Sequence, residues 1–222
     1  MTIVKITLAA ILLFVGYTIS SADTGMGSRE SFIDMRDGQR YRIVRIGNLT
    51  WMAENLNYKT GSSWCFKNDL VDDSNCRKYG RLYDWNTAMT ACPAGWRLPN
   101  RENWDNLCQA VGGEKTTCNQ YWDAWFGAAT KLKSKSGWVN LECGTEIGGT
   151  DDYGFSALPG GLYDPDNAYG YHFQDASEIG YWWTATENGD SAYIRLMPYS
   201  YPSVYESTSN KSYGFSVRCV RN

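Results

Sequence analysis

A single histidine limits the nucleophilic chemistry open to this chain. His172 lies in 164-DPDNAYGYH-172, a segment rich in turn-forming residues. The chain has no G-x-S-x-G sequence, the motif that presents a catalytic serine on a strand-to-helix turn. We therefore predict no triad of the Ser-His-Asp type. We also assign no catalytic residue.

Carboxylates leave glycoside hydrolysis open, because that reaction needs two acids whose separation is spatial and cannot be found in sequence. No motif surrounds the glutamates that would be candidates, Glu54, Glu178 and Glu187. The chain is therefore predicted not to be an enzyme. A glycan-active enzyme remains the alternative.

Two acidic segments raise the question of calcium. Asp164, Asp166 and Asn167 resemble the start of a calcium loop, but no glycine stands at the sixth position and no glutamate at the twelfth. A second polar loop, between Cys65 and Cys76, carries three aspartates, Asp69, Asp72 and Asp73. Solvated turns are the more common role of such residues. We predict no metal and no cofactor.

The cysteines indicate a disulfide framework. Seven are present, at positions 65, 76, 92, 108, 118, 143 and 219, without the C-x-x-C spacing typical of zinc sites. A bridge between Cys65 and Cys76 would remove about 3 kcal/mol of unfolded-state entropy. Cys108 and Cys118 lie close enough in sequence to link two predicted helices. The odd count leaves one thiol over.

The first 22 residues are typical of a secretory leader. A positive start at Lys5 precedes the apolar run 6–15 and the small residues Ser20-Ser21-Ala22. The apolar run is too short to span a membrane comfortably, so we expect no membrane insertion once the leader is removed. The sequence thus predicts a signal peptide at 1–22, a flexible lead-in at 23–31 and one domain at 32–222. The protein is expected to be secreted or held at a bacterial surface.

Charge and composition narrow the class of partner. The formal net charge is −3 and no run of lysine or arginine occurs, which argues against nucleic acid. Ten tryptophans, sixteen tyrosines and seven phenylalanines are more rings than one core of this size would bury. We expect some of them at the surface, where aromatic rings suit binding.

Three helices are predicted to position these residues. Asp84 caps a helix over 85–91, which ends at Cys92-Pro93, and Asn100 caps the next. The second helix has one apolar face, made by Trp104, Leu107, Cys108 and Val111. A third helix is predicted over 119–133, with an apolar stripe of Trp122, Trp125, Phe126 and Ala129.

Short strands are predicted on both sides of the helices. The first pair, 32–35 and 41–46, forms a hairpin around the favoured turn Asp37-Gly38. After residue 138 the chain alternates between glycine-rich loops and strands at 154–161, 181–187, 192–197 and 204–205. In the last strand Phe215, Val217 and Cys219 share one face.

Five sequence blocks, in this order, resemble the Fibrobacter succinogenes major paralogous domain: IGNLTWMAENLNY, YGRLYDWNTAMTACPAGWRLPNRENW, DDYGFSALPGG, GYWWTATE and KSYGFSVRCV. The similarity covers roughly 33–221. It implies an α+β fold like that of C-type lectin domains, in the branch that includes formylglycine-generating enzymes. Such a fold has two to three helices, short antiparallel strands, long loops and disulfides. The family is secreted or surface-attached in bacteria.

The resemblance carries the fold and leaves the sites open. It implies a structural disulfide between Cys92 and Cys219, which leaves Cys143 as the extra thiol. The Glu-Pro-Asn, Gln-Pro-Asp and Trp-Asn-Asp motifs of calcium-dependent sugar sites do not occur. The reactive cysteine pair of the formylglycine-generating enzymes is not expected either, because Cys219 lies on the last core strand.

The predicted function is that of a secreted, non-catalytic binding module whose partner is a polysaccharide or a surface protein. Loop aromatics would bind it, namely Tyr171, Trp182, Trp183, Tyr199, Tyr201 and Tyr205. Neighbours on a strand point to opposite faces, so one of Trp182 and Trp183 is expected in the core and the other at the surface. Equally, these rings could serve to pack down long loops.

Two alternatives stay open. One is an enzyme, either a glycan-active hydrolase or a copper-type oxidase that would need Cys219 as a free thiol. The other is a structural or adhesion component of a surface assembly, for which Cys143 would form an interchain disulfide.

Overall fold

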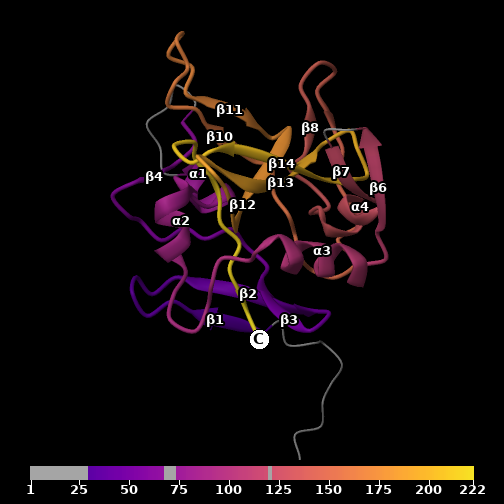
Figure 1. Cartoon of the computed structure of the whole chain (residues 1–222), viewed down its shortest axis with the longest axis horizontal. Coiled ribbons are helices and arrows are strands. Elements are labelled where there is room, and N and C mark those ends of the chain that lie inside the picture. Colours follow the sequence, from indigo (N-terminus) through magenta and orange to yellow (C-terminus); the bar gives the residue numbers. More distant parts are fainter. Residues whose placement is uncertain (1–29, 68–73, 120–121) are drawn as a thin grey trace, which may run out of the picture.

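The computed structural model describes residues 30–67, 74–119 and 122–222 (Figure 1). The predicted leader, the lead-in up to residue 29 and the three aspartates of the 65–76 loop lie outside the described residues. Strand β1 (Ser31–Ile33) begins at the last residue of the predicted lead-in. No helix in the described ranges is long and apolar enough to cross a membrane.

A small antiparallel sheet gathers the two ends of the described chain. Its strand order is β1, β2 (Arg40–Ile46), β3 (Leu49–Met52) and β16 (Val220–Arg221). The predicted hairpin around Asp37-Gly38 is confirmed, with Gly38 at φ 75° as the turn requires. This sheet and the C-terminus lie at the bottom of Figure 1.

A larger sheet forms the body of the protein. Its main path runs β4 (Ser63–Trp64), β5 (Leu82–Tyr83), β15 (Phe215–Ser216), β12 (Ile179–Asn188), β13 (Ser191–Pro198), β14 (Val204–Asn210), β7 (Trp122–Phe126) and β6 (Glu114–Asn119). The hairpin of β10 (Gly160–Tyr163) and β11 (Phe173–Ala176) joins this sheet beside β12. A separate pair consists of β8 (Val139–Asn140) and β9 (Thr145–Glu146). The strands predicted over 181–187, 192–197 and 204–205 are thus confirmed.

Two of the three predicted helices are present. Helix α2 (Trp85–Ala91) is capped by Asp84, whose Oδ1 accepts from the backbone N–H of Thr87 at 2.7 Å. Helix α3 (Arg101–Ala110) starts with a reciprocal capping box between Asn100 and Asn103. Two shorter helices, α1 (Ser74–Tyr79) and α4 (Ala128–Leu132), complete the described set.

The predicted helix over 119–133 is wrong. This region forms part of the β6–β7 hairpin, and only its end is helical, in α4. Trp125 is buried while its neighbour Phe126 is 55% exposed, which is the alternation of a strand. Gly127, at φ 78°, then turns the chain into α4. On a strand, residues i and i+3 lie on opposite faces, so the i, i+3, i+4 spacing of apolar residues did not mark one buried face here.

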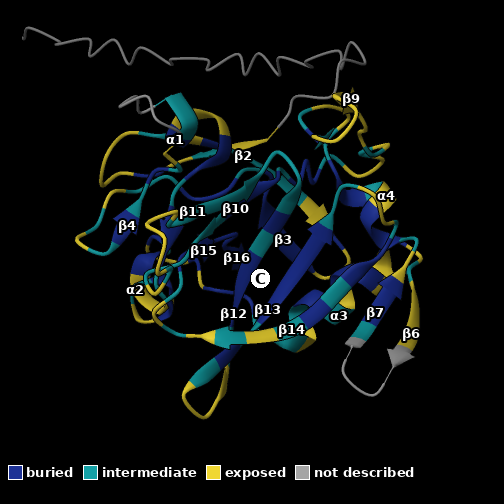
Figure 2. Cartoon of the chain, turned by 90° about the horizontal axis from the view of Figure 1, so that it is seen from above, coloured by how far each residue is buried: buried dark blue, intermediate teal, exposed yellow. Residues whose placement is uncertain are grey.

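Both faces of the large sheet are buried at its centre (Figure 2). Trp182 packs with α3 in one core, with its ring 5.9 Å from that of Trp104. Trp183 packs with α2 in the other core, with its ring 4.6 Å from that of Phe215. The two indoles do point to opposite faces, but the expectation that one is exposed is wrong, because a helix covers each face.

The five sequence blocks meet in one buried hydrogen-bond cluster. Asn55, from the first block, accepts at Oδ1 from Trp182 Nε1 at 2.9 Å and from Arg218 Nη2 at 2.8 Å. Its Nδ2 donates to the backbone oxygen of Tyr79 in the second block. Arg218 also donates to the backbone oxygen of Phe155 in the third block. The shared blocks therefore build the scaffold.

Two of the three expected disulfides are present, Cys65–Cys76 and Cys92–Cys219. The predicted link from Cys108 is wrong, because Cys108 is a free thiol on the buried face of α3. Burial raises the pKa of this thiol to about 12, so it stays protonated at neutral pH. Its expected partner, Cys118, has a side chain outside the described part of the chain. Cys143 is free and exposed.

Candidate functional site

The tip of the β10–β11 hairpin presents two exposed tyrosines. Tyr169 is 85% exposed and Tyr171 is 74% exposed. Asn167 fixes the backbone beneath them, since its Oδ1 accepts from the N–H groups of Tyr169 at 3.0 Å and Tyr171 at 3.2 Å. Asp164 closes the base of the tip, where its backbone N–H donates to the oxygen of His172 at 2.7 Å. Both rings thus project from an ordered turn, at the top of Figure 1.

Below the tip lies a half-exposed aromatic platform of Trp64, Phe66, Tyr163 and Phe173. Trp64 and Tyr163 stack with their ring centres 4.3 Å apart and their planes 16° apart. Phe173 lies directly across the hairpin from Tyr163, with its ring 5.2 Å away. Phe66 extends the platform by an edge contact with Phe173. Two of the platform rings, those of Tyr163 and Phe173, therefore belong to the same hairpin as the tyrosines of the tip.

Gly214 packs closely against two rings of the platform. It exchanges two backbone hydrogen bonds with Tyr163, of 2.8 and 2.9 Å. A Cβ atom at this position would lie 2.9 Å from the Cβ of Tyr163 and 3.2 Å from the ring of Trp64. Both contacts are closer than van der Waals separation. Glycine is therefore needed here for the Trp64–Tyr163 stack.

A second group of tyrosines lies on the turn after β13. Tyr201 is 55% exposed and meets the edge of Tyr205, while Tyr199 is half-buried. The buried Lys133 holds this turn, since its Nζ donates to the backbone oxygens of Pro198, of Tyr199 at 3.1 Å and of Tyr201 at 2.9 Å. Desolvation lowers the pKa of Lys133 to about 8.

The structure does not bring the six predicted site residues together. Trp182 and Trp183 are in the core and offer no ring face to a ligand. Tyr171 lies at the tip of the hairpin. Tyr199 lies beyond the other end, where its N–H donates to the oxygen of Glu178, two residues after β11. The binding roles of Tyr171, Tyr199, Tyr201 and Tyr205 stay predictions.

Sequence reasoning missed the platform. Trp64 and Phe66 flank Cys65 with the alternation of a strand, and Tyr163 and Phe173 bracket the turn-rich tip symmetrically. Those two patterns were available signals. The sequence alone did not indicate that β10 pairs with β11, or that residues 63–66 lie against that hairpin.

The residues considered for triad, calcium and oxidase chemistry have structural roles. The ring of His172 lies with Nδ1 2.7 Å from the backbone oxygen of Asp164, which makes it part of the turn. Asp164 Oδ1 accepts from the N–H of Asp166, as in an ordinary Asx turn. Cys219, which the oxidase hypothesis required as a free thiol, is bridged to Cys92. Within the described ranges, no three His, Cys, Asp or Glu side chains are grouped closely enough to hold a metal.

Comparison with known proteins gives one match. The model of the Fibrobacter succinogenes major domain matches residues 44–221, which include all five sequence blocks. No curated protein and no solved structure matches the chain.

Proposed function

The chain belongs to the Fibrobacter succinogenes major domain family, and we propose that it is a secreted, non-catalytic module that binds polysaccharide through the β10–β11 hairpin. The observation that carries the proposal is the exposure of Tyr169 and Tyr171 on a turn whose backbone is already fixed. An ordered turn lowers the entropy lost on binding. Exposed aromatic rings on a rigid support are suited to stacking on sugar rings.

The polar surroundings of the tyrosines favour a sugar over an apolar partner. Asp166 is exposed beside them, and the phenol groups add donors and acceptors for hydroxyls. The platform of Trp64 and Tyr163 offers a second, half-exposed pair of rings at the base of the same hairpin. A chain of sugars could therefore contact the tip and the platform in succession, without a metal.

We further propose that the fold is of the C-type lectin type, in the branch of the formylglycine-generating enzymes. Its support is the order of the five sequence blocks, the two capped helices α2 and α3, and the Cys92–Cys219 disulfide directly before β16. The leader-like sequence of residues 1–22 supports secretion, and we propose that the protein acts at a bacterial surface.

Retention on insoluble polysaccharides tests the proposed function. The wild type and a Tyr169→Ala/Tyr171→Ala variant are mixed with cellulose, xylan and chitin, and the bound fraction is measured. Phe126→Ala, which removes an exposed ring from β7, is the matched control. We expect at least one polysaccharide to retain the wild type and the control, and to release the double variant. Equal retention of all three proteins would refute the role of the tip, and retention only on immobilised proteins would refute a polysaccharide ligand.

A further inference from the structure

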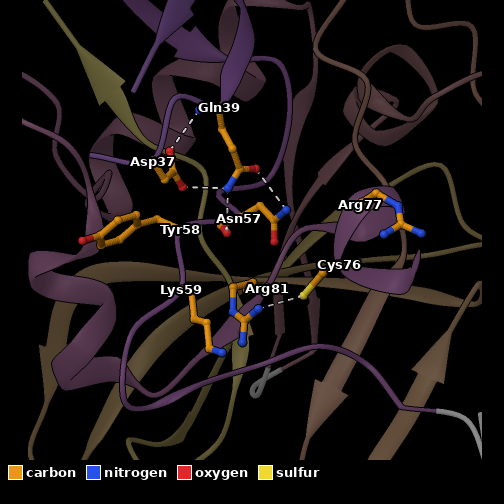
Figure 3. A pocket seen from close by; sticks show the side chains of 8 residues that line it. All are labelled: Asp37, Gln39, Asn57, Tyr58, Lys59, Cys76, Arg77 and Arg81. Atoms are coloured by element: carbon orange, nitrogen blue, oxygen red, sulfur yellow. Dashed lines mark hydrogen bonds between the residues drawn. The ribbon is translucent and has the colours of Figure 1, made fainter. Parts of the chain in front are cut away.

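A polar hollow of about 500 Å³ opens beside α1 (Figure 3). The turn between β1 and β2, the segment after β3 and the end of α1 form its walls. Its lining residues are Asp37, Gln39, Asn57, Tyr58, Lys59, Cys76, Arg77 and Arg81. A hollow of this size is within the range of small-molecule sites.

Three cationic side chains, those of Lys59, Arg77 and Arg81, line the hollow together with one carboxylate, that of Asp37. Lys59 is exposed and has no hydrogen-bond or ion-pair partner in the described part of the chain. Arg81 donates to Ser63 Oγ at 3.0 Å and to the Ser63 backbone oxygen at 3.1 Å, while its Nη1 lies 3.3 Å from both sulfurs of the Cys65–Cys76 disulfide. Sulfur is a weak acceptor, so the guanidinium charge is held in place but is not neutralised. In Figure 3 the side chains of Lys59 and Arg81 extend in the same direction.

The opposite wall supplies fixed hydrogen-bonding groups. Asp37 accepts from the backbone N–H of Gln39 at 3.0 Å and from its Nε2 at 2.7 Å. Gln39 Oε1 accepts from Asn57 Nδ2 at 3.0 Å. The Asn57 Oδ1 atom has no partner and points away from Gln39, on the side of Arg81. Buried acceptors are rarely left without a donor, so this atom is an unsatisfied polar group beside the hollow.

We propose that this hollow binds the carboxylate of an acidic sugar, with Lys59 and Arg81 on the carboxylate and Asp37 on the hydroxyls. The inference rests on the proposed polysaccharide-binding function and names its ligand class, a polysaccharide that contains uronic acid. Asp37 makes the hollow selective among anionic ligands. Its carboxylate accepts hydroxyl donors, and it repels the higher charge of a phosphate or sulfate placed in the same hollow. A sugar that carries one carboxylate and several hydroxyls satisfies both walls.

One short segment connects this hollow to the aromatic platform. Ser63 and Cys65 contact Arg81, whereas the alternate residues Trp64 and Phe66 contribute to the platform. The Cys65–Cys76 disulfide therefore braces both surfaces at once. The proposed uronic acid site and the aromatic platform therefore lie on opposite sides of the segment 63–66.

Titration calorimetry with trigalacturonate tests the inference. The neutral control ligand is the fully methyl-esterified trisaccharide, which has the same rings without the charges. We expect the free acid to bind the wild type, and Lys59→Gln to weaken that binding about tenfold, the effect of one charge-assisted hydrogen bond. Lys135→Gln is the matched variant, because it removes one exposed lysine elsewhere and leaves the same net charge. Equal binding of the two trisaccharides, or equal affinities of the two variants, would overturn the proposal.

Two further measurements distinguish a failure of this inference from a failure of the proposed function. Equimolar inorganic sulfate should not displace trigalacturonate, and displacement would show a general anion site in place of a sugar site. Tyr169→Ala/Tyr171→Ala should still bind the trisaccharide through the hollow. If polysaccharide retains the wild type while trigalacturonate does not bind, the inference fails and the proposed function stands. If trigalacturonate binds and no polysaccharide retains the protein, the proposed function fails and the site in the hollow stands.

Discussion

Replacing Lys133 by methionine should change how the stability of this protein depends on pH. Lys133 lies buried under the turn that carries Tyr199 and Tyr201, with its ammonium group on three backbone oxygens and 4.8 Å from the ring centre of Trp138. No carboxylate pairs with it in the described ranges. Desolvation lowers its pKa from 10.5 to about 8.

The sign of the effect follows from proton binding. Between pH 8 and 10.5 the unfolded chain keeps the proton of Lys133 and the folded chain has lost it, so unfolding takes up a proton. Raising the pH through this window therefore stabilises the fold. Each pKa unit corresponds to about 1.4 kcal/mol, so the wild type should gain about 3 kcal/mol relative to Lys133→Met.

Urea unfolding of both proteins at several pH values between 7 and 11 measures this difference. Subtracting the variant from the wild type removes the contributions of other titrating groups, such as Tyr41, whose pKa burial raises. Lys135→Met, which removes an exposed lysine two residues along the chain, is the matched control and should give a curve parallel to the wild type. Parallel curves for Lys133→Met as well would refute the reasoning, since they would mean that burial does not shift the proton.

Three more predictions concern residues that stabilise the fold beneath these surfaces. In each case urea unfolding measures the loss in free energy of unfolding. Gly214→Ala should cost about 1–3 kcal/mol and change the near-ultraviolet circular dichroism, because the added Cβ displaces the Trp64–Tyr163 stack. Glu206→Gln should cost about 1.5–3 kcal/mol, because the buried Arg195 then loses one of its two carboxylate partners and keeps Asp105. Replacing both Cys92 and Cys219 by serine should cost about 5 kcal/mol, because their bridge joins residues 127 positions apart.

Each of these predictions has its own control. Gly61→Ala meets no atom within 4 Å and should be neutral or slightly stabilising, and a loss equal to that of Gly214→Ala would contradict the steric cause. Glu187→Gln breaks an exposed pair with Lys211, and a cost as large as that of Glu206→Gln would contradict the argument from burial. Removing Cys65–Cys76, which closes a separation of 11 residues, should cost about 3 kcal/mol, and a cost above that of the longer bridge would contradict the loop-length argument.

Local signals in the sequence were sufficient for much of the fold. Asp84 and Asn100 marked the starts of α2 and α3, and Asp37-Gly38 marked the first hairpin, because caps and tight turns depend on neighbouring residues alone. The helix predicted over 119–133 failed for the opposite reason. Pairing of β7 with β14 is a long-range contact, and it overrides a local apolar spacing that suits a helix equally well.

The candidate site was predictable only in part. The turn-forming composition of 164–172 made it possible to predict that Tyr171 lies at the surface, since loops of this kind are usually exposed. Trp182 and Trp183 were misassigned because their exposure depends on whether helices cover one face of the sheet or both, which no alternation pattern reveals. The hollow with Lys59 and Arg81 was not found at all, because its walls come from three separate segments.

Hydroxyl-radical footprinting of the protein, free and bound to a polysaccharide that retains it, tests whether the hairpin tip is the binding surface. We expect the oxidation of Tyr169 and Tyr171 to fall on binding, while that of the exposed rings of Phe126 and Tyr153 does not change. Protection of Phe126 or Tyr153 with the hairpin tip left fully reactive would contradict this expectation.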